Sequence, residues 1–257
     1  MENKYFFVID NNSSKSLLLK KKLNSILCKE NWVENEEKSE FIFVIGGDGT
    51  FLKNVDKYSD KKIVAINGGN LGYFSSFNSK NIDSILKTIK NEKLFKNILM
   101  LNVNIDNNNY WGLNEVYICS DTTLKTNIYI CHQKLELFKG TGLMVSTPMG
   151  STAHNKNAGG AIIWQNENLI QLLEVHPITQ KKYSTLKSPL ILNYNSTIEL
   201  INASNDFGNI IIDGKKIKDC FINKIKITTE FSHFKVCVPT TLKPYIQKLR
   251  DSFIREK

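Results

Sequence analysis

Residues 41–50, FIFVIGGDGT, constrain the fold of this chain more than any other stretch. The run 41–45 is apolar and has high β propensity, which predicts a short strand buried on both faces. Three glycines follow within four residues and flank the carboxylate of Asp48. Glycine lets a ligand approach the main chain, and N–H groups before a helix favour phosphate oxygens. The order of strand, glycine-rich turn and helix predicts a turn that binds a phosphorylated ligand. The alternative is a purely structural turn in which Asp48 caps the helix.

A carboxylate repels phosphate, so we expect Asp48 to face a hydroxyl group or a metal ion. A second glycine-rich turn, residues 68–72, follows another short apolar run. In an open parallel sheet, turns after neighbouring strands meet at the carboxyl edge, so both turns are expected to face one crevice. Tyr73 and Phe74 could then stack on a base or ring; the alternative is a plain β-turn. The first ninety or so residues thus predict an α/β layer structure, with strands at 5–9, 41–45 and 63–67 and helices at 14–28, 51–58 and 80–90.

Period-two alternation of β-branched residues dominates after about residue 96. The turn dipeptides Asp106-Asn107, Lys139-Gly140 and Asp213-Gly214 punctuate it. This pattern favours an all-β domain, either a sandwich or a closed stack of sheets. We therefore expect an α/β domain at 1–96 and a β-rich domain at 97–239.

The C-terminal residues 241–256 return to helical periodicity. We expect this helix to fold back onto the first domain, so that residues 240–257 complete it. The apolar stripe that predicts the contact consists of Leu242, Tyr245, Ile246, Leu249 and Phe253.

Charge and cysteine usage narrow the class of protein. The 257 residues include 34 Lys and Arg against 25 Asp and Glu, a net charge of +9. The lysines are scattered and no arginine-rich arm is present, so we expect no nucleic-acid partner. No signal peptide or membrane span is predicted, and a cytoplasmic protein without a membrane partner is expected. The five isolated cysteines are interpreted as buried free thiols in a reducing compartment, rather than zinc ligands or disulfides.

Two polar motifs stand out in the second half. Asn114-Glu115 precedes a short apolar run, and its donors and acceptors could grip a ribose diol or an adenine edge; a surface turn is the alternative. Residues 146–160, STPMGSTAHNKNAGG, concentrate small and hydroxyl-bearing side chains. Ser151 and Thr152 are expected near a helix start with hydroxyls available to a ligand, and the alternative is a loop with an N-cap.

Together these motifs resemble the NAD kinase family. GGDGT at 46–50, NE at 114–115 and GSTAH at 150–154, followed by AGG at 158–160, stand in the family's order. The turn at 72–74 and the Asp213-Gly214 pair are also similar to the family's. GGDGT alone occurs in lipid kinases and resembles a phosphofructokinase motif, whereas the combination is specific and covers nearly the whole chain.

The resemblance implies transfer of a phosphoryl group from ATP, or from polyphosphate, to the 2′-hydroxyl of the adenosine ribose of NAD. It also implies a Rossmann-like first domain, a β-rich dinucleotide-binding second domain, and a homodimer or homotetramer. Mg²⁺ or another divalent cation is expected to come with ATP, and no metal is expected to be held by protein side chains alone.

By the same resemblance, Asp48 is the catalytic proton acceptor for the 2′-hydroxyl. Asp48 and Gly49 are expected at the acceptor ribose, Lys53 on its phosphate side, and the NE pair at the adenosine end. The nucleotide site implied by the resemblance further includes Gly46, Gly47, Thr50, Phe74, Asn114, Glu115, Lys139, Thr141, Thr152, Ala153, His154, Asn155, Lys156, Asn157, His176 and Lys215.

Several positions depart from the family pattern. Thr141 stands where Asp is usual, His154 replaces Tyr, Asn157 replaces Ser and Met149 replaces Thr. These changes predict retained activity with altered dinucleotide affinity. Two alternatives stay open, namely a lipid or sugar kinase that shares the GGDGT loop, and a non-catalytic dinucleotide-binding protein.

Overall fold

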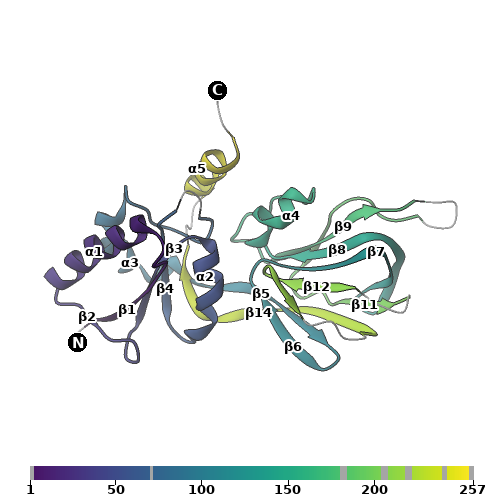
Figure 1. Ribbon diagram of the computed structural model, residues 1–257, viewed down its shortest axis with the longest axis horizontal. Helices are drawn as coiled ribbons and strands as arrows, with labels where there is room; N and C mark the ends of the chain where they lie inside the picture. Colours follow the sequence, from purple (N-terminus) through teal and green to yellow (C-terminus); the bar gives the residue numbers. More distant parts are fainter. Residues whose placement is uncertain are drawn as a thin grey trace. The chain divides into compact units, whose positions relative to one another are not determined.

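The computed structural model describes residues 3–69, 72–179, 184–203, 208–217, 222–238 and 242–254. The chain divides into two compact units, Met1–Ile98 with Ser232–Lys257, and Leu99–Phe231. Two long strands carry the chain across this division, namely β5 (Phe95–Ile105) and β14 (Lys224–Cys237) (Figure 1).

A parallel sheet forms the centre of the first unit. Its strands follow the order β14-β4-β3-β1-β2, and these pairs are parallel. The central strand β3 (Phe41–Gly46) is buried at every position, as the apolar run at 41–45 predicted. The other strands are β1 (Lys4–Ile9), β2 (Val33–Glu34) and β4 (Lys62–Asn67).

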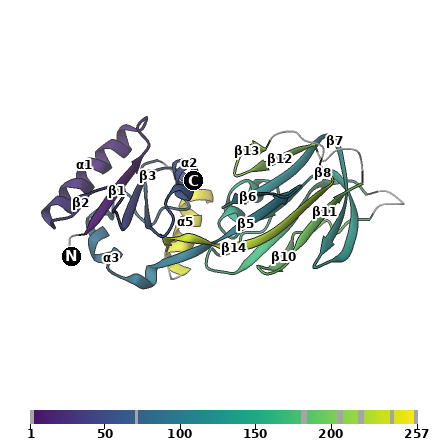
Figure 2. The ribbon, with the colours of Figure 1, turned by 90° about the horizontal axis from the view of Figure 1, so that it is seen from below.

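The predicted helix at 14–28 is α1 (Ser14–Lys29), which lies alongside β1 and β3 (Figures 1 and 2). It begins at Ser13, whose side chain accepts a hydrogen bond from the N–H of Ser16, as an N-cap should. The helix predicted at 51–58 begins earlier, as α2 (Asp48–Asn54), and continues as the 3₁₀ turn η1 (Val55–Lys57). The helix predicted at 80–90 is shorter and consists of η2 (Ile82–Ser84) and α3 (Ile85–Ile89), followed by η3 (Glu92–Leu94).

The C-terminal helix α5 (Leu242–Phe253) belongs to the first unit, which confirms the predicted return. Tyr245 is buried, and Lys248 hydrogen-bonds to main-chain oxygens after β4. The predicted stripe is wrong at Ile246, which is 52% exposed because the contact is made by the neighbouring face of the helix.

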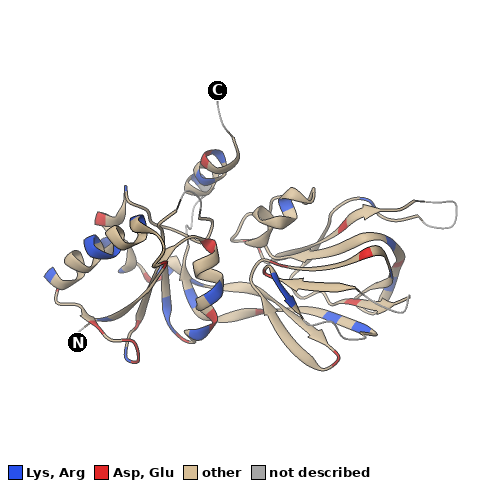
Figure 3. Ribbon diagram, viewed as in Figure 1, with Lys and Arg blue, Asp and Glu red and all other residues tan. Residues whose placement is uncertain are grey.

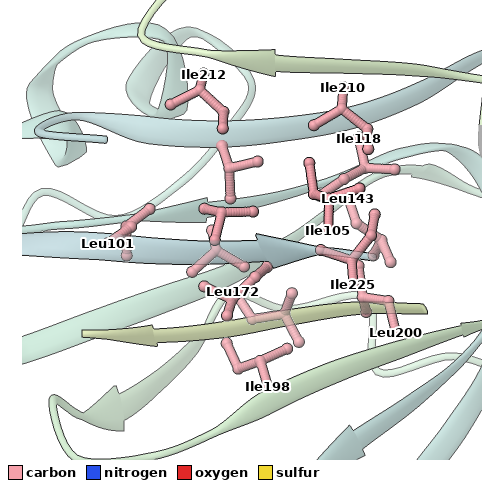
Figure 4. Packing of buried hydrophobic residues seen from close by; sticks show 14 of the residues in the cluster. Leu101, Ile105, Ile118, Leu143, Leu172, Ile198, Leu200, Ile210, Ile212 and Ile225 are labelled. Carbon is pink, nitrogen blue, oxygen red and sulfur yellow. The ribbon is translucent and has the colours of Figure 1, made fainter. Parts of the chain in front are cut away.

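The second unit is all-β, as predicted, and its strands pair antiparallel. The order β10-β9-β8-β7-β11-β14 runs along one path, β12 pairs with β7 and with β13, and β5 pairs with β6 and β14 (Figure 2). Its core is a cluster of branched aliphatic side chains drawn in Figure 4, among them Ile118, Leu143 and Leu200. The strands are β6 (Asn108–Gly112), β7 (Glu115–Ile130), β8 (Gln133–Ser146), β9 (Leu169–Pro177), β10 (Leu190–Asn193), β11 (Ile198–Asn202), β12 (Asn209–Ile212) and β13 (Lys215–Ile217).

Tight turns join several of these strands. Asp106-Asn107 and Asp213-Gly214 have positive φ at both residues, the backbone that a two-residue hairpin turn needs. Cys131-His132 takes the same conformation between β7 and β8, although this dipeptide contains neither glycine nor asparagine, which would have predicted the turn.

The expectation of buried cysteines is wrong for Cys28 and Cys131, which are exposed. Cys28 lies in the last turn of α1, and Cys131 lies in the hairpin turn just described, where the chain meets solvent. Cys119 is partly buried and Cys237 is buried, all four are free, and Cys220 lies outside the described residues.

Lys and Arg are spread over helices and strands of both units rather than gathered on one element (Figure 3). None of the helices in the described ranges combines the length and apolar character that crossing a membrane requires.

Candidate active site

Asp48 is the first residue of α2 and follows the buried strand β3 through Gly46 and Gly47. Its carboxylate accepts two main-chain hydrogen bonds from the turn after β4. The N–H of Tyr73 lies 3.0 Å from Oδ2, and the N–H of Phe74 lies 3.1 Å from Oδ1. Both carboxylate oxygens are therefore fixed by one turn, and each keeps a further acceptor site.

The glycines around Asp48 act through space rather than through unusual backbone angles. None of Gly46, Gly47 and Gly49 is among the described residues with positive φ. A Cβ at Gly46 would lie 2.6 Å from Oγ1 of Thr50, so a larger residue would displace that side chain. Around Gly47 and Gly49, apart from chain neighbours and the helix backbone, no atom of the described residues lies within 4 Å of the Cβ position, so a ligand can approach the main chain there. Lys53, one turn later, is exposed.

The two glycine turns lie side by side at the carboxyl edge of the parallel sheet, as predicted. Gly46 pairs with Asn67 in register, and the N–H of Gly68 donates to the carbonyl of Gly46 at 3.1 Å. The aromatic rings behave differently from the prediction of base stacking. Phe74 is 3% exposed and stacks on Phe51 at 4.4 Å, so its contribution to Asp48 is its N–H group.

Opposing influences act on the proton affinity of Asp48. Burial raises its pKa above the ordinary value, while the N–H groups of Tyr73 and Phe74 and the charge of Lys248 oppose that rise. Lys248 lies on α5 and donates to the carbonyls of Tyr73 and Ser75 at 2.8 and 2.9 Å. Lys248 is not among the site residues predicted from the sequence, because its contact with this turn has no local signal in a helical stripe.

In the second unit, Asp213 organises the NE pair. Its carboxylate accepts the N–H groups of Leu113, Asn114 and Glu115 at 2.7, 2.8 and 3.2 Å. Asp213 occupies the positive-φ turn between β12 and β13, which brings it to the start of β7. Burial raises the pKa of Asp213, and the three N–H groups and nearby Lys215 offset part of that effect. Lys215 itself is exposed.

The side chains of the NE pair are buried acceptors. Neither Oδ1 of Asn114 nor Oε2 of Glu115 has a protein hydrogen-bond partner in the described part of the chain. Burial, with a smaller contribution from the charge of Asp213, raises the pKa of Glu115 to about 7. Buried acceptors without partners are costly, so these two oxygens suit a ligand that brings donors.

The glycine block at 146–160 folds onto the NE pair. The N–H of Thr147 donates to the carbonyl of Asn114 at 2.9 Å, and its hydroxyl donates to the carbonyl of Leu113 at 2.6 Å. The block then forms η4 (Gly150–Thr152) and α4 (His154–Asn157).

The expectation of hydroxyls available to a ligand is wrong for Ser151 and Thr152. Ser151 donates to the carbonyl of Pro148 at 2.7 Å, and Thr152 donates to that of Met149 at 3.2 Å. Short loops satisfy their own backbone in this way. Asn155 is likewise fully buried and accepts from the amide of Gln171, so its side chain holds the loop together.

The remaining residues of the block are more open. His154 and Asn157 are exposed, and Ala153 and Lys156 are partly buried. The ring of His154 meets that of Tyr117 edge-on at 5.2 Å. Tyr117, on β7 two residues after Glu115, is a neighbour of the block that sequence analysis did not name.

Lys139, Thr141 and His176 are brought together by the pairing of β8 with β9, in which Gly140 faces Pro177. The hydroxyl of Thr141 donates to the carbonyl of Val175 at 2.9 Å and lies 3.3 Å from Nδ1 of His176. His176 is exposed and has positive φ. These residues therefore lie on the neighbouring strands β8 and β9.

Within the described ranges, no three His, Cys, Asp or Glu side chains gather closely enough to hold a metal ion.

Comparison with known proteins gives consistent matches over both units. Residues 3–94 match the family described as ATP-NAD kinase N-terminal domain, and residues 113–236 match the ATP-NAD kinase C-terminal domain. The chain is 34% identical to the NAD kinase of Mycoplasmoides gallisepticum, over 98% of this chain and 95% of that protein. It is 36% identical to the NAD kinase of Ureaplasma parvum serovar 3, over 88% and 86% of the two chains.

Solved structures share the fold. The yeast NADH kinase complexed with NADH superposes with a TM-score of 0.79 at 17% identity, covering 97% of this chain and 86% of that one. The NAD kinase of Archaeoglobus fulgidus in complex with ATP gives 0.77 at 18% identity, covering 98% and 99%.

Proposed function

Because the chain belongs to the NAD kinase family and is therefore an ATP-dependent kinase that converts NAD to NADP, we propose that it phosphorylates the 2′-hydroxyl of the adenosine ribose, with Asp48 as the proton acceptor. The observation that supports this role most is the pair of main-chain hydrogen bonds that fix both oxygens of Asp48. A fixed carboxylate with an acceptor site left on each oxygen can receive the hydrogen bond of a substrate hydroxyl.

Phosphoryl transfer requires little of Asp48 beyond accepting the hydrogen bond of the substrate hydroxyl. Phosphoryl transfer passes through a loose transition state, so catalysis consists of positioning and charge stabilisation, and the proton leaves late. Burial raises the pKa of Asp48, which makes it a better base, while the N–H groups and Lys248 favour its ionised form. The open approach over Gly47 and Gly49 would admit the substrate to the main chain beside it.

We propose that the second unit is the dinucleotide-binding part. There, Oδ1 of Asn114 and Oε2 of Glu115 would accept hydrogen bonds from the hydroxyl or amino groups of adenosine. Their burial without a donor among the described residues supports this assignment. The exposed His154, Asn157, His176 and Lys215, the exposed Lys53 of the first unit, and the more covered Lys139, Thr141 and Lys156 are proposed as further substrate contacts.

The divalent cation is proposed to arrive as a complex with ATP, where it would neutralise phosphate charge. We also propose that the chain forms a homodimer or homotetramer and that it acts in the cytoplasm. The four cysteines within the described residues, all of them free, support the second of these proposals. Light scattering on the purified full chain would measure the oligomeric state.

A coupled assay for NADP formation tests the function, crossing ATP and polyphosphate with NAD and NADH. Identification of the product as the 2′-phosphate tests the position of transfer. Diacylglycerol as acceptor tests the lipid kinase alternative, and absence of any turnover would support a binding protein instead.

Asp48→Asn tests the proton acceptor. We expect normal folding and nucleotide binding with turnover lower by about 10²–10⁴-fold, the usual contribution of a positioned acid or base. Asp56→Asn, at an exposed position of η1, is the matched control and should keep its activity. Near-normal turnover of Asp48→Asn would remove Asp48 from the mechanism.

A further inference from the structure

Lys248 and Asp48 are bound to opposite ends of one peptide group. The ammonium of Lys248 donates to the carbonyl of Tyr73 at 2.8 Å. The N–H of the same peptide group, which belongs to Phe74, donates to Oδ1 of Asp48 at 3.1 Å. A cation, a peptide dipole and a carboxylate therefore stand in series, an arrangement in which each hydrogen bond strengthens the next.

Lys248 also holds the next part of the same turn. Its second hydrogen bond reaches the carbonyl of Ser75 at 2.9 Å. Because one ammonium bridges the carbonyls of Tyr73 and Ser75, the turn between them has little freedom to rotate. Rotation would withdraw the two N–H groups that hold Asp48.

Further contacts from α5 fix the same turn. The ring of Phe253 stacks on that of Tyr73 at 5.4 Å with an interplanar angle of 21°. Ser252 of α5 lies near the phenol of Tyr73. The helix thus grips the turn through both the ammonium and an aromatic ring.

From this geometry we propose that Lys248 is a positioning residue for Asp48, and that α5 is thereby part of the catalytic machinery rather than only a cover for the first unit. This inference rests on the proposed role of Asp48. Lys248 would act in two ways, by orienting the peptide groups that bind the carboxylate and by favouring its ionised form.

The charges around Asp48 make the second effect measurable. The ionisable groups facing it from packed elements are Lys248 on α5 and the phenol of Tyr73, behind which lies that of Tyr245. Burial lowers the pKa of Lys248 to about 8, and the charge of Asp48 opposes that fall, so the ammonium is mostly charged at pH 7. Both tyrosine phenols have raised pKa values and stay neutral there.

The decisive variant is Lys248→Met, which keeps the length of the side chain and removes the charge and the donors. We expect kcat to fall by about tenfold or more, the effect of misplacing a reacting group. The KM values for NAD and ATP should stay within about twofold. The acid limb of the kcat profile should move to higher pH, because Asp48 loses the cation that favours its ionised form.

Lys248→Arg is the conservative rescue. A cleft of about 350 Å³ borders Lys248, so the larger guanidinium has room, and we expect most of the lost kcat and the original acid limb to return. Lys248→Gln keeps an N–H donor without charge and isolates the electrostatic effect. It should show the shifted acid limb even if Lys248→Met fails to fold. Lys243→Met, at an exposed position of the same helix, should behave as wild type.

Thermal unfolding of each full-length variant, together with Asp48→Asn, separates the possible results. If Asp48→Asn is inactive but Lys248→Met and Lys248→Gln keep normal kcat and pH profiles, the inference is wrong and the proposed function stands. A loss of kcat without a shifted acid limb and without rescue by Arg would assign Lys248 a purely structural role and would also overturn it. Normal turnover of Asp48→Asn would instead remove the premise.

Discussion

Gly150 packs directly against the main chain of Asn114. A Cβ at Gly150 would overlap the carbonyl oxygen of Asn114 and would lie 2.6 Å from its Cα. The glycine block and the NE pair can therefore meet only if position 150 has no side chain. This contact links the two motifs of the second unit that the family resemblance singled out.

We predict that Gly150→Ala raises the KM for NAD, because the added methyl pushes Asn114 away from its place. The strain should also lower the free energy of unfolding by about 1–3 kcal/mol, as overpacking usually does. Steady-state kinetics and denaturant unfolding measure the two effects. In the control Gly69→Ala, the methyl meets no atom of the described residues beyond its chain neighbours closer than 3.6 Å, and the free energy of unfolding should stay unchanged. An unaltered KM in Gly150→Ala would show that this contact does not matter for binding.

The acidic side chain of the NE pair should make NAD capture pH-dependent. Burial raises the pKa of Glu115 to about 7, with the charge of Asp213 adding to it. If ionised Glu115 accepts from adenosine, kcat/KM for NAD rises as pH increases through about 7. The pH profile of kcat should bend at a lower pH than that of kcat/KM, because the hydrogen-bond donors of bound NAD favour the ionised form of Glu115. Glu115→Gln is expected to abolish the bend near pH 7, and a bend that persists in this variant would belong to another group.

A pair of carboxyl groups in the second unit should destabilise the fold at alkaline pH. Burial raises the pKa of Glu136 to about 8, and its hydrogen bond with Glu174 adds to the rise. Glu174 in turn accepts the N–H of Lys187 at 2.9 Å. The folded state therefore holds a proton that the unfolded chain releases near its ordinary pKa of 4.5.

The contribution of the Glu136 carboxyl group to the free energy of unfolding should accordingly be largest below about pH 4.5. It should be lost as pH rises through about 8. Glu136→Gln, which cannot ionise, should flatten that decline. Urea unfolding at pH 6, 7, 8 and 9 measures it, with exposed Glu167→Gln as control. Parallel declines in wild type and Glu136→Gln would exclude a shared proton.

Thr141 stands where the family pattern has an aspartate, and in the structure its hydroxyl donates to the carbonyl of Val175. His176 lies 3.3 Å away. We predict that Thr141→Asp lowers the KM for NAD and leaves kcat within about threefold, because a carboxylate there restores an acceptor for the dinucleotide and can pair with His176. An unchanged KM would argue against a dinucleotide contact at this position.

The local sequence pattern was sufficient to predict much of the secondary structure. The apolar run ending at Ile45 and the spacing in α1 predicted their elements almost to the residue, because burial on one or two faces leaves a periodic trace. The Asp213-Gly214 turn was also predicted from the sequence, because few residues accept positive φ. The Cys131-His132 turn was not predicted, because the pairing of the neighbouring strands β7 and β8 imposed positive φ on residues that do not favour it.

Site geometry was less predictable than site membership. The hydroxyls of Ser151 and Thr152 point into their own loop, and the ring of Phe74 packs on Phe51. Hydroxyl and aromatic side chains serve either a ligand or the protein, and the choice depends on which neighbour the folded chain brings near. Lys248 and Tyr73 are 175 positions apart, so no local pattern announces their contact.

The amino-acid sequence by itself determined the α/β and β-rich halves, the order of the three motifs and the identity of the acid at position 48. Periodicity and glycine content are set by neighbours a few residues apart, so these features can be read along the chain. Only the tertiary structure decided that Asp48 is held by Tyr73 and Phe74, and that a lysine of the last helix grips the same turn. Those contacts arise because packing of α5 against the first unit brings together groups that sequence separation keeps apart.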